Sequence, residues 1–368
     1  MMKNEFAVTA TESMRFYAGA VIQHLKNYSS LSGSNIDATN DLLVKRFADG
    51  EMEVEVISSM RGKDVILFAS SARNEAGLSV NDAKIELYHT IDALKRSRCG
   101  KIIVFEPYVS CSRSDRPLAR NSVGLWVHFK TLVSLGTEHI VTYQLHSDKS
   151  KAMLDPAICV LDDIPIFTLL KKHLCDNYIK DLNTLENVVR NTWAFCSVDA
   201  GGEKITRRFA NAFGAPLVIA HKQRDYSRAN TVESINILSA EPLDGKILWI
   251  VDDMIDTGGS VISLINALTK QNPKEINIIA VHAPFSGEAA SKLSDLYHKN
   301  MINRIIVSDT TYFPPAIPQM LPSLQIVSTS ELSALVIRHL VSSASMANIH
   351  ESFNAHEYLA NCDLFLTC

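Results

Sequence analysis

Short apolar runs alternate with amphipathic stretches along most of this 368-residue chain. The runs have the length of buried strands, and the stretches between them place apolar residues at helical spacing. The expected strands are Val65–Ala69, Ile102–Phe105, His139–Tyr143, Thr192–Val198, Pro216–Ala220, Ile247–Val251, Ile276–Val281 and Ile305–Val307. The expected helices include Asn81–Arg98, Lys204–Phe213 and Val261–Gln271. This alternation predicts an α/β protein whose mostly parallel sheets are flanked by helices.

The length of the chain allows two domains of ordinary size, each with a hydrophobic core of its own. A new series of strands and helices begins near residues 162–170. We therefore predict an N-terminal domain over residues 1–165 and a C-terminal domain over residues 166–341. The last stretch, residues 342–368, is less periodic. We expect it to be an extension that packs back on the N-terminal domain or on a neighbouring molecule.

The composition, with 46% apolar and 21% charged residues, is typical of a water-soluble globular protein. A net charge of −4 argues against a general nucleic-acid-binding surface. No apolar run approaches the length that spans a bilayer, and the N-terminus has no long apolar core. We therefore expect neither a membrane anchor nor a secretory signal. The seven cysteines are scattered without a CxxC pair, which favours a reducing cytoplasm over a disulfide framework or a zinc ribbon.

Polar residues that can bind a ligand follow several of the expected strands at their carboxyl ends. They include Arg113-Ser114-Asp115, His146, Asp199-Ala200-Gly201-Gly202 and His221-Lys222-Gln223-Arg224. Ligands of parallel α/β sheets bind outside the carboxyl ends of the strands. The small residues Ala200, Gly201 and Gly202 have backbone amides that can converge on an anion. The sequence therefore predicts a functional site at this edge of the sheets.

Residues 247–261 form the most informative of these strand ends. The apolar strand runs into two carboxylates, Asp252 and Asp253, and then into a polar loop before a helix begins. The loop consists of Asp256, Thr257, Gly258, Gly259 and Ser260. Backbone N–H groups at a helix N-terminus face an anion, hydroxyl groups add donors, and glycines let the backbone approach closely. We therefore predict a phosphate-binding loop rather than an ordinary turn with an acidic cap.

This segment resembles the motif that binds 5-phosphoribosyl diphosphate (PRPP), two acids followed by D-T-x-G-[ST]. Type I phosphoribosyltransferases share it with the ribose-phosphate diphosphokinases, which make PRPP. Six further stretches, in the same order along the chain, resemble the diphosphokinase family: Phe47–Glu51, Pro107–Arg116, Leu145-His146, Ser197–Lys204, His221–Arg224 and Phe285–Gly287. The resemblance covers most of the chain. It implies two tandem type I phosphoribosyltransferase-like domains, the first on the ATP side and the second carrying the PRPP motif.

The resemblance implies an enzyme that transfers the β,γ-diphosphate of ATP to the anomeric hydroxyl of ribose 5-phosphate, giving PRPP and AMP. Lys222 and Arg224 match the catalytic flap, although a solvated charged loop is the ordinary alternative. Asp199 and His146 match ligands of Mg²⁺, and His146 is also consistent with a structural histidine. Asp252, Asp253 and residues 256–260 would hold the ribose and its 5-phosphate, and residues 200–202 the transferred diphosphate.

The resemblance also implies where ATP binds. Arg113, Ser114 and Asp115 would contact the nucleotide, and so would three residues of an early turn, Phe47, Asp49 and Glu51. In this family the early turn reaches the nucleotide of a neighbouring subunit. A homo-oligomer is therefore expected, specifically a hexamer built from dimers. Phe47 is equally consistent with an aromatic residue of the hydrophobic core.

Several positions depart from the family pattern. Gln144 stands where the family usually has Asp, which removes one carboxylate near the metal. Ser114 replaces a Gln beside Arg113, and Val198 replaces a Pro before Asp199. Three alternatives to PRPP synthesis therefore stay open. They are a diphosphokinase of a larger ribose acceptor such as ADP-ribose, a non-catalytic regulatory relative, and a phosphoribosyltransferase that consumes PRPP.

Overall fold

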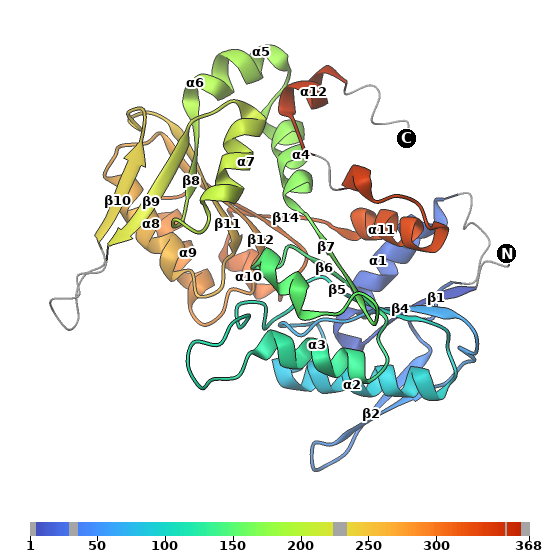
Figure 1. The fold of residues 1–368 in the computed structure, drawn as a ribbon. Helices are drawn as coiled ribbons and strands as arrows, with labels where there is room; N and C mark the ends of the chain where they lie inside the picture. Colours follow the sequence, from blue (N-terminus) through green and yellow to red (C-terminus); the bar gives the residue numbers. More distant parts are fainter. Residues whose placement is uncertain (1–4, 29–35, 224–233, 350–351, 362–368) are drawn as a thin grey trace. The chain divides into compact units, whose positions relative to one another are not determined.

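The computed structural model describes residues 5–28, 36–223, 234–349 and 352–361 (Figure 1). The chain divides into two compact units. The first unit contains Met1–Pro165, Thr310–Tyr312 and Ser328–His350, and the second contains Ile166–Asp309, Phe313–Val327 and Glu351–Cys368. Residues 328–341, which the sequence analysis assigned to the C-terminal domain, thus group with the first unit. Over the described residues, no helix is both long enough and apolar enough to cross a bilayer.

A parallel sheet forms the centre of the first unit, and its strand order is β1-β4-β5-β6-β7. The strands are β1 (Phe6–Ala10), β4 (Asp64–Phe68), β5 (Ile102–Glu106), β6 (His139–Tyr143) and β7 (Val160–Ile164). A separate antiparallel hairpin, which extends away from the sheet in Figure 1, consists of β2 (Leu42–Arg46) and β3 (Met52–Val56). The main helices are α1 (Arg15–Lys26), α2 (Val80–Arg96), α3 (Gly124–Ser134) and α11 (Ser330–Ser342).

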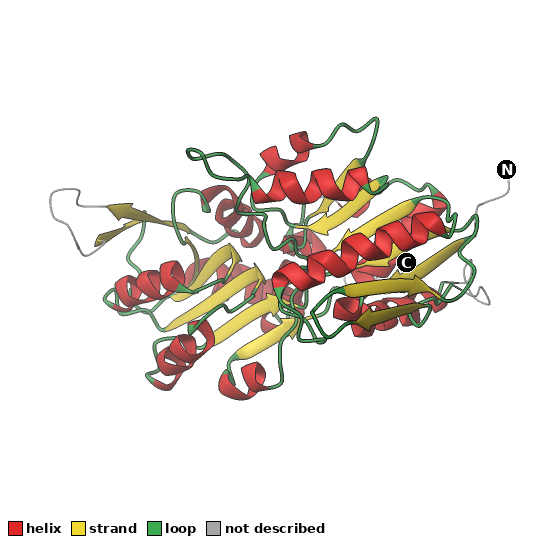
Figure 2. Ribbon diagram, turned by 90° about the horizontal axis from the view of Figure 1, so that it is seen from below, coloured by secondary structure: helices red, strands yellow, loops and turns green. Residues whose placement is uncertain are grey.

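Both faces of this sheet are buried, which explains why its central strands are nearly continuous apolar runs. Side chains such as Leu67 and Val104 pack with those of α2 and α3 on one face. The opposite face carries a row of aromatic rings, Phe68, Phe105 and Tyr143, whose neighbouring centroids are 4.8 and 5.4 Å apart. Tyr17 of α1 packs edge-on against Phe68 at 5.5 Å. Helices therefore cover the sheet from two sides (Figure 2).

The second unit contains a larger sheet with the order β10-β9-β8-β11-β12-β13-β14, in which β10 alone is antiparallel to its neighbour. The strands are β8 (Trp193–Ser197), β9 (Leu217–Gln223), β10 (Ser234–Ser239), β11 (Ile247–Met254), β12 (Glu275–His282), β13 (Arg304–Ser308) and β14 (Leu324–Val327). The helices of eight or more residues are α4 (Phe167–Tyr178), α7 (Glu203–Phe213), α8 (Gly259–Thr269) and α9 (Ala289–His298). Near the end of the described chain lies α12 (Ala355–Ala360).

This sheet is also covered on two faces. Leu264 of α8 and Leu293 of α9 join one apolar cluster with the strands. On the other face, Phe195 of β8 packs against Phe209 and Phe213 of α7, with ring centroids 5.7 and 5.4 Å apart. The α/β class predicted from the alternation of apolar runs is therefore confirmed.

Candidate active site

Three carboxylates gather at the carboxyl edge of the sheet in the second unit. Asp252 and Asp253 lie in the last part of β11, and Asp199 follows β8, the parallel neighbour of β11. The N–H of Asp253 donates to Asp252 Oδ1 at 2.9 Å. Burial raises the pKa of Asp252 well above its ordinary value, and the negative charges of Asp253 and Asp199 raise it further. Such a cluster attracts hydroxyl donors and cations.

The predicted phosphate-binding loop follows these acids and leads into α8. Gly258 is the N-cap of this helix and has a φ of +74°, a left-handed conformation that glycine adopts without strain. Its carbonyl accepts from the N–H of Ile262 at 2.8 Å, which begins the helix. Thr257, Gly259 and Ser260 are exposed. The first N–H groups of a helix have no partner within the helix, so this turn suits a bound anion.

A second turn, at residues 282–287, is hydrogen-bonded to the segment that leads into the phosphate-binding loop. The N–H of Ile255 donates to His282 O at 2.8 Å, and the N–H of Ser286 donates to Asp256 O at 2.9 Å. Phe285 is fully buried, and its N–H donates to Ile255 O at 3.2 Å. The Phe285–Gly287 motif therefore supports the phosphate-binding loop structurally, a role that its residue types did not indicate in the sequence.

The segment Asp199–Gly202 folds onto itself before α7 begins. Asp199 Oδ1 accepts from the N–H of Gly202 at 3.0 Å, and Gly202 is the N-cap of α7. A β-carbon at Gly201 would come 3.2 Å from the same oxygen, closer than ordinary contact. Asp199, Ala200 and Gly201 are exposed. The carboxylate of Asp199 thus shapes a short exposed loop at the end of β8.

The two flap residues lie at or beyond the end of β9. Lys222 belongs to this strand, where its backbone is paired with Ile235 of β10. Arg224 lies outside the described residues. The roles of both residues therefore remain predictions from the sequence.

The early turn of the first unit is the tip of the β2–β3 hairpin. The N–H of Phe47 donates to Glu51 O at 2.8 Å, and Asp49 Oδ1 accepts from the N–H of Glu51 at 3.1 Å. Phe47 is 49% exposed, so it does not belong to the hydrophobic core of this unit. Asp49 and Glu51 are exposed as well. The tip therefore presents an aromatic ring and two acids on the surface of this unit.

The loop with Arg113 lies between β5 and α3. Arg113 is exposed, and Ser114 and Asp115 are partly buried. Ser114 Oγ accepts from the N–H of Gly124 at 2.9 Å, and Ser114 O accepts from the N–H of Leu125 at 3.1 Å. Ser114 therefore anchors the loop to the start of α3, a role that the sequence did not reveal.

His146 lies on the exposed turn that follows β6. Two residues earlier, Gln144 has a φ of +42°, an unfavourable conformation for a residue with a β-carbon. The intervening Leu145 donates its N–H to Asp163 Oδ1 of β7 at 2.9 Å. This turn belongs to the first unit, whereas Asp199 belongs to the second. Joint metal binding by His146 and Asp199 therefore remains a prediction.

Comparison with known proteins identifies the family. The chain is 30% identical over 311 residues to the ribose-phosphate pyrophosphokinase of Mycoplasma genitalium, which covers 84% of this chain and 86% of that protein. The chain belongs to the ribose-phosphate pyrophosphokinase family. The ribose-phosphate pyrophosphokinase of Ureaplasma parvum is 31% identical over 310 residues, and the match covers 84% of this chain and 86% of that protein. This family is the one also called the ribose-phosphate diphosphokinases. The predicted family and the prediction that the protein is an enzyme are therefore confirmed.

Domain and structure comparisons agree with this membership. A model of the N-terminal domain of ribose phosphate pyrophosphokinase matches residues 7–136, and a phosphoribosyl transferase domain model matches residues 162–314. The crystal structure of phosphoribosylpyrophosphate synthetase from Mycobacterium smegmatis gives a TM-score of 0.77 at 23% identity. The match covers 92% of this chain and 100% of that chain. The fold of the ribose-phosphate pyrophosphokinase family, with two phosphoribosyltransferase-type domains, is therefore confirmed.

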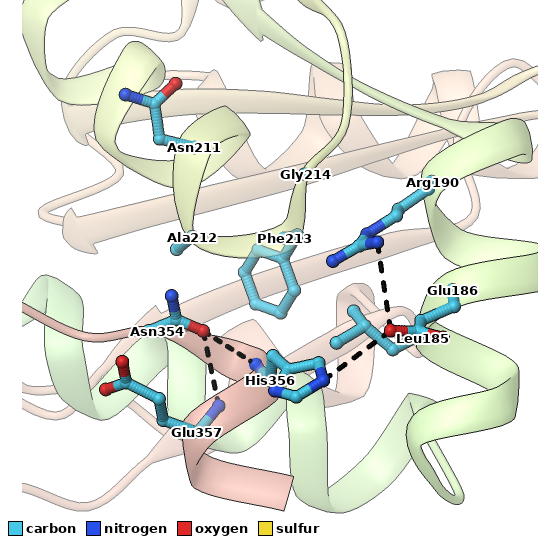
Figure 3. A pocket seen from close by; sticks show the side chains of 10 residues that line it. All are labelled: Leu185, Glu186, Arg190, Asn211, Ala212, Phe213, Gly214, Asn354, His356 and Glu357. Atoms are coloured by element: carbon cyan, nitrogen blue, oxygen red, sulfur yellow. Dashed lines mark hydrogen bonds and ion pairs between the residues drawn. The ribbon is translucent and has the colours of Figure 1, made fainter.

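A surface pocket of about 310 Å³ in the second unit lies apart from the family motifs (Figure 3). Its lining comes from Leu185, Glu186, Arg190, Asn211, Ala212, Phe213, Gly214, Asn354, His356 and Glu357. Glu186 lies 3.9 Å from Arg190 and 3.5 Å from His356. None of the residues predicted for the active site lines this pocket. Within the described residues, no group of three His, Cys, Asp or Glu side chains is arranged to hold a metal ion.

Proposed function

We propose that this member of the family transfers the β,γ-diphosphate of ATP to the anomeric hydroxyl of ribose 5-phosphate. The products are PRPP and AMP. The observation that carries the proposal is the arrangement in the second unit. The acids of β11, the N-terminus of α8 and the Asp199–Gly202 loop lie at the carboxyl ends of neighbouring strands. The proposal extends the activity of the relatives to this chain.

The ribose 5-phosphate would bind at the end of β11. The N–H groups and hydroxyls of residues 256–260 would hold the 5-phosphate at the positive end of α8. Asp252 and Asp253 would accept hydrogen bonds from the ribose hydroxyls. We propose that the anomeric carbon then faces the loop that follows β8, the direct parallel neighbour of β11.

The diphosphate would lie over Asp199–Gly202, where small residues leave the backbone accessible. Mg²⁺ would neutralise phosphate charge there and draw electrons from the phosphorus under attack. This ion takes oxygen ligands, retains several waters and needs only one or two carboxylates besides the phosphates. Asp199 fits that donor set, and we propose His146 as the contribution of the first unit.

In the transfer step, the anomeric oxygen of the sugar attacks the β-phosphorus of ATP and loses its proton. The bond between the β-phosphorus and the oxygen that bridges it to the α-phosphorus breaks, and AMP leaves with that oxygen. We propose that the cationic side chains of Lys222 and Arg224 stabilise the charge on the transferred group. Lys222→Ala should therefore lower kcat by orders of magnitude and leave the melting temperature nearly unchanged.

The nucleotide would contact Arg113, Ser114 and Asp115 of the first unit. We also propose that the exposed tip at Phe47, with Asp49 and Glu51, reaches the nucleotide of a neighbouring subunit in a homo-oligomer. The order of that oligomer, a hexamer built from dimers, is proposed on the resemblance alone. We also propose a cytoplasmic enzyme, on the scattered spacing of the cysteines in the sequence.

The test is AMP release from Mg·ATP with either ribose 5-phosphate or ADP-ribose as acceptor, followed by mass spectrometry of the products. We expect ribose 5-phosphate to gain one diphosphate group and ADP-ribose to gain none. A gain on ADP-ribose alone would refute the acceptor assigned here. The absence of AMP with both acceptors would refute catalysis and favour a regulatory relative.

A further inference from the structure

The geometry points to Glu106 as a positioning residue for the loop that carries Arg113. Glu106 is the last residue of β5, and its side chain is fully buried in the first unit. No family motif described above includes it. A buried carboxylate is costly unless hydrogen bonds and an opposite charge compensate for lost water. The inference rests on the proposed function in one respect, because it takes Arg113 as a contact of ATP.

The carboxylate of Glu106 bonds in two directions. Its Oε1 accepts from the hydroxyl of Ser71, and its Oε2 lies 2.8 Å from Nε2 of His128 in α3. Burial raises the pKa of Glu106, but the charge and hydrogen bond of His128 and the hydrogen bond of Ser71 hold it below its ordinary value. His128 is buried too, and its Nδ1 lies 2.9 Å from the hydroxyl of Tyr88 in α2.

The network has two arms, and the first, which runs from Glu106 through Ser71, positions the start of the loop. The oxygen of Ser71, whose hydrogen points to Glu106, accepts from the backbone N–H of Ser110 at 3.2 Å. The backbone then turns, and the N–H of Ser114 donates to Cys111 O at 2.9 Å. Glu106 therefore fixes the position of Ser110 through a single intervening side chain.

The other arm controls the end of the loop. Ser114 Oγ accepts from the N–H of Gly124, the first residue of α3. Contact is close here, since a β-carbon at Gly124 would come 3.3 Å from that oxygen. His128 follows about one helical turn later and bonds back to Glu106. These hydrogen bonds and the backbone that connects them thus form a circuit that starts and ends at Glu106, and Arg113 lies within it.

Substitutions at Glu106 distinguish the effect of its hydrogen bonds from the effect of burying a side chain. Glu106→Ala removes the acceptor for both arms, so the buried hydroxyl of Ser71 and the ring of His128 each lose one hydrogen-bond partner. Glu106→Gln has the same shape, can accept from Ser71, and can donate from its amide to Nε2 of a neutral His128 ring. A matched control is Leu132→Ala, which truncates a fully buried side chain of the same helix outside the circuit.

The experiment measures two quantities that do not require turnover. They are the dissociation constant of Mg·ATP by calorimetry and amide hydrogen exchange of the peptide spanning residues 107–115. We expect Glu106→Ala to weaken ATP binding about tenfold, the effect of losing one hydrogen bond to a charged group, and to speed exchange at Ser110–Ser114. Glu106→Gln should stay within about threefold of the wild type. Leu132→Ala should change neither quantity.

Equal effects of Glu106→Ala and Leu132→Ala on binding and exchange would overturn the inference, and so would unchanged ATP affinity in Glu106→Ala. If Glu106→Ala does not fold, Ser71→Ala cuts one arm alone and must show the same two changes. Weakened ATP binding in a protein that releases no AMP with ribose 5-phosphate would refute the proposed reaction and leave the role of Glu106 intact. The two failures are therefore distinguishable.

Discussion

Gly258 provides the sharpest test of the phosphate-binding loop. Its φ of +74° lies in the left-handed region, where a residue with a β-carbon is strained. A β-carbon built there would lie 3.5 Å from Ile262 Cδ1 and 3.7 Å from Ala289 Cβ, which are ordinary van der Waals distances. Gly258→Ala therefore adds backbone strain at the N-cap of α8 without a steric clash.

The magnitude follows from that strain. A left-handed conformation costs an L-residue about 1–2 kcal/mol. Since about 1 kcal/mol lowers the melting temperature of a domain of this size by roughly 2–4 °C, we expect a decrease of about 2–8 °C. We expect the variant loop to relieve part of this strain by rotating away from the left-handed conformation, which would turn N–H donors away from a bound phosphate. One lost hydrogen bond to a charged group would raise the KM for ribose 5-phosphate about tenfold or more.

Gly245→Ala is the matched control. Gly245 has a φ of +69° in the same unit, and no heavy atom lies within 4 Å of the position that a β-carbon would take there. It should lower the melting temperature by a similar amount and leave the KM for ribose 5-phosphate unchanged. Thermal unfolding and AMP-release kinetics measure both effects. An equal rise in KM in the two variants, or a normal KM in Gly258→Ala, would refute the reasoning.

Three further substitutions test the charges of two acids in the second unit and the backbone strain at Gln144. The raised pKa of Asp252 makes folding less favourable as pH rises above 3.8, so Asp252→Asn should melt at or above the wild-type temperature at pH 7 while losing turnover; a lower melting temperature would contradict this. Asp199→Asn keeps the acceptor for Gly202 N–H but loses the charge, so the Mg²⁺ concentration for half-maximal AMP release should rise with an unchanged melting temperature. An unaltered Mg²⁺ titration would exclude Asp199 as a ligand. Gln144→Gly should raise the melting temperature by roughly 2–4 °C, because it relieves about 1 kcal/mol of positive-φ strain; a decrease would show that the Gln144 side chain contributes more than this strain costs.

Local apolar patterns predicted the central strands because helices cover both faces of each sheet. The strand expected at His139–Tyr143 has those bounds as β6. The strand expected to end at Val251, however, continues through both acids to Met254. Asp252 still pairs with Ala280 of β12, since backbone hydrogen bonding continues after the apolar run has ended. A search for apolar runs therefore misses the part of a strand whose side chains are polar.

Elements whose partners are distant in the chain escaped the sequence analysis. The edge strand β7 contains two acids and no long apolar run. Its Asp162 lies 2.8 Å from His139 Nε2, and its Asp163 accepts from the N–H of Leu145. Those contacts form between residues that lie about one βα unit apart in sequence. A local pattern does not contain them, and the same reason hid the support that residues 282–287 give to the phosphate-binding loop.

The motifs predicted which residues carry the candidate chemistry, but not which neighbouring residues hold these side chains in position. Asp252 and Asp199 were found because acids beside glycines at strand ends are a recognisable pattern. Glu106 was not, because one acid after an apolar run has no pattern of its own. Its importance appears only when the fold brings Ser71 and His128 to it.

Helix α11 has a consequence for how the protein is made. It lies beside α1, and the hydroxyl of Tyr17 bonds to Ser333 of α11 at 2.7 Å (Figure 1). A ribosome therefore releases the whole sheet of the first unit long before it synthesises the helix that completes this unit. Until then α1 lacks this packing partner, and Tyr17 lacks its hydrogen bond to Ser333. A fragment that ends at Pro165 would therefore lack part of the packing of this unit, and such incompletely packed units are prone to aggregate.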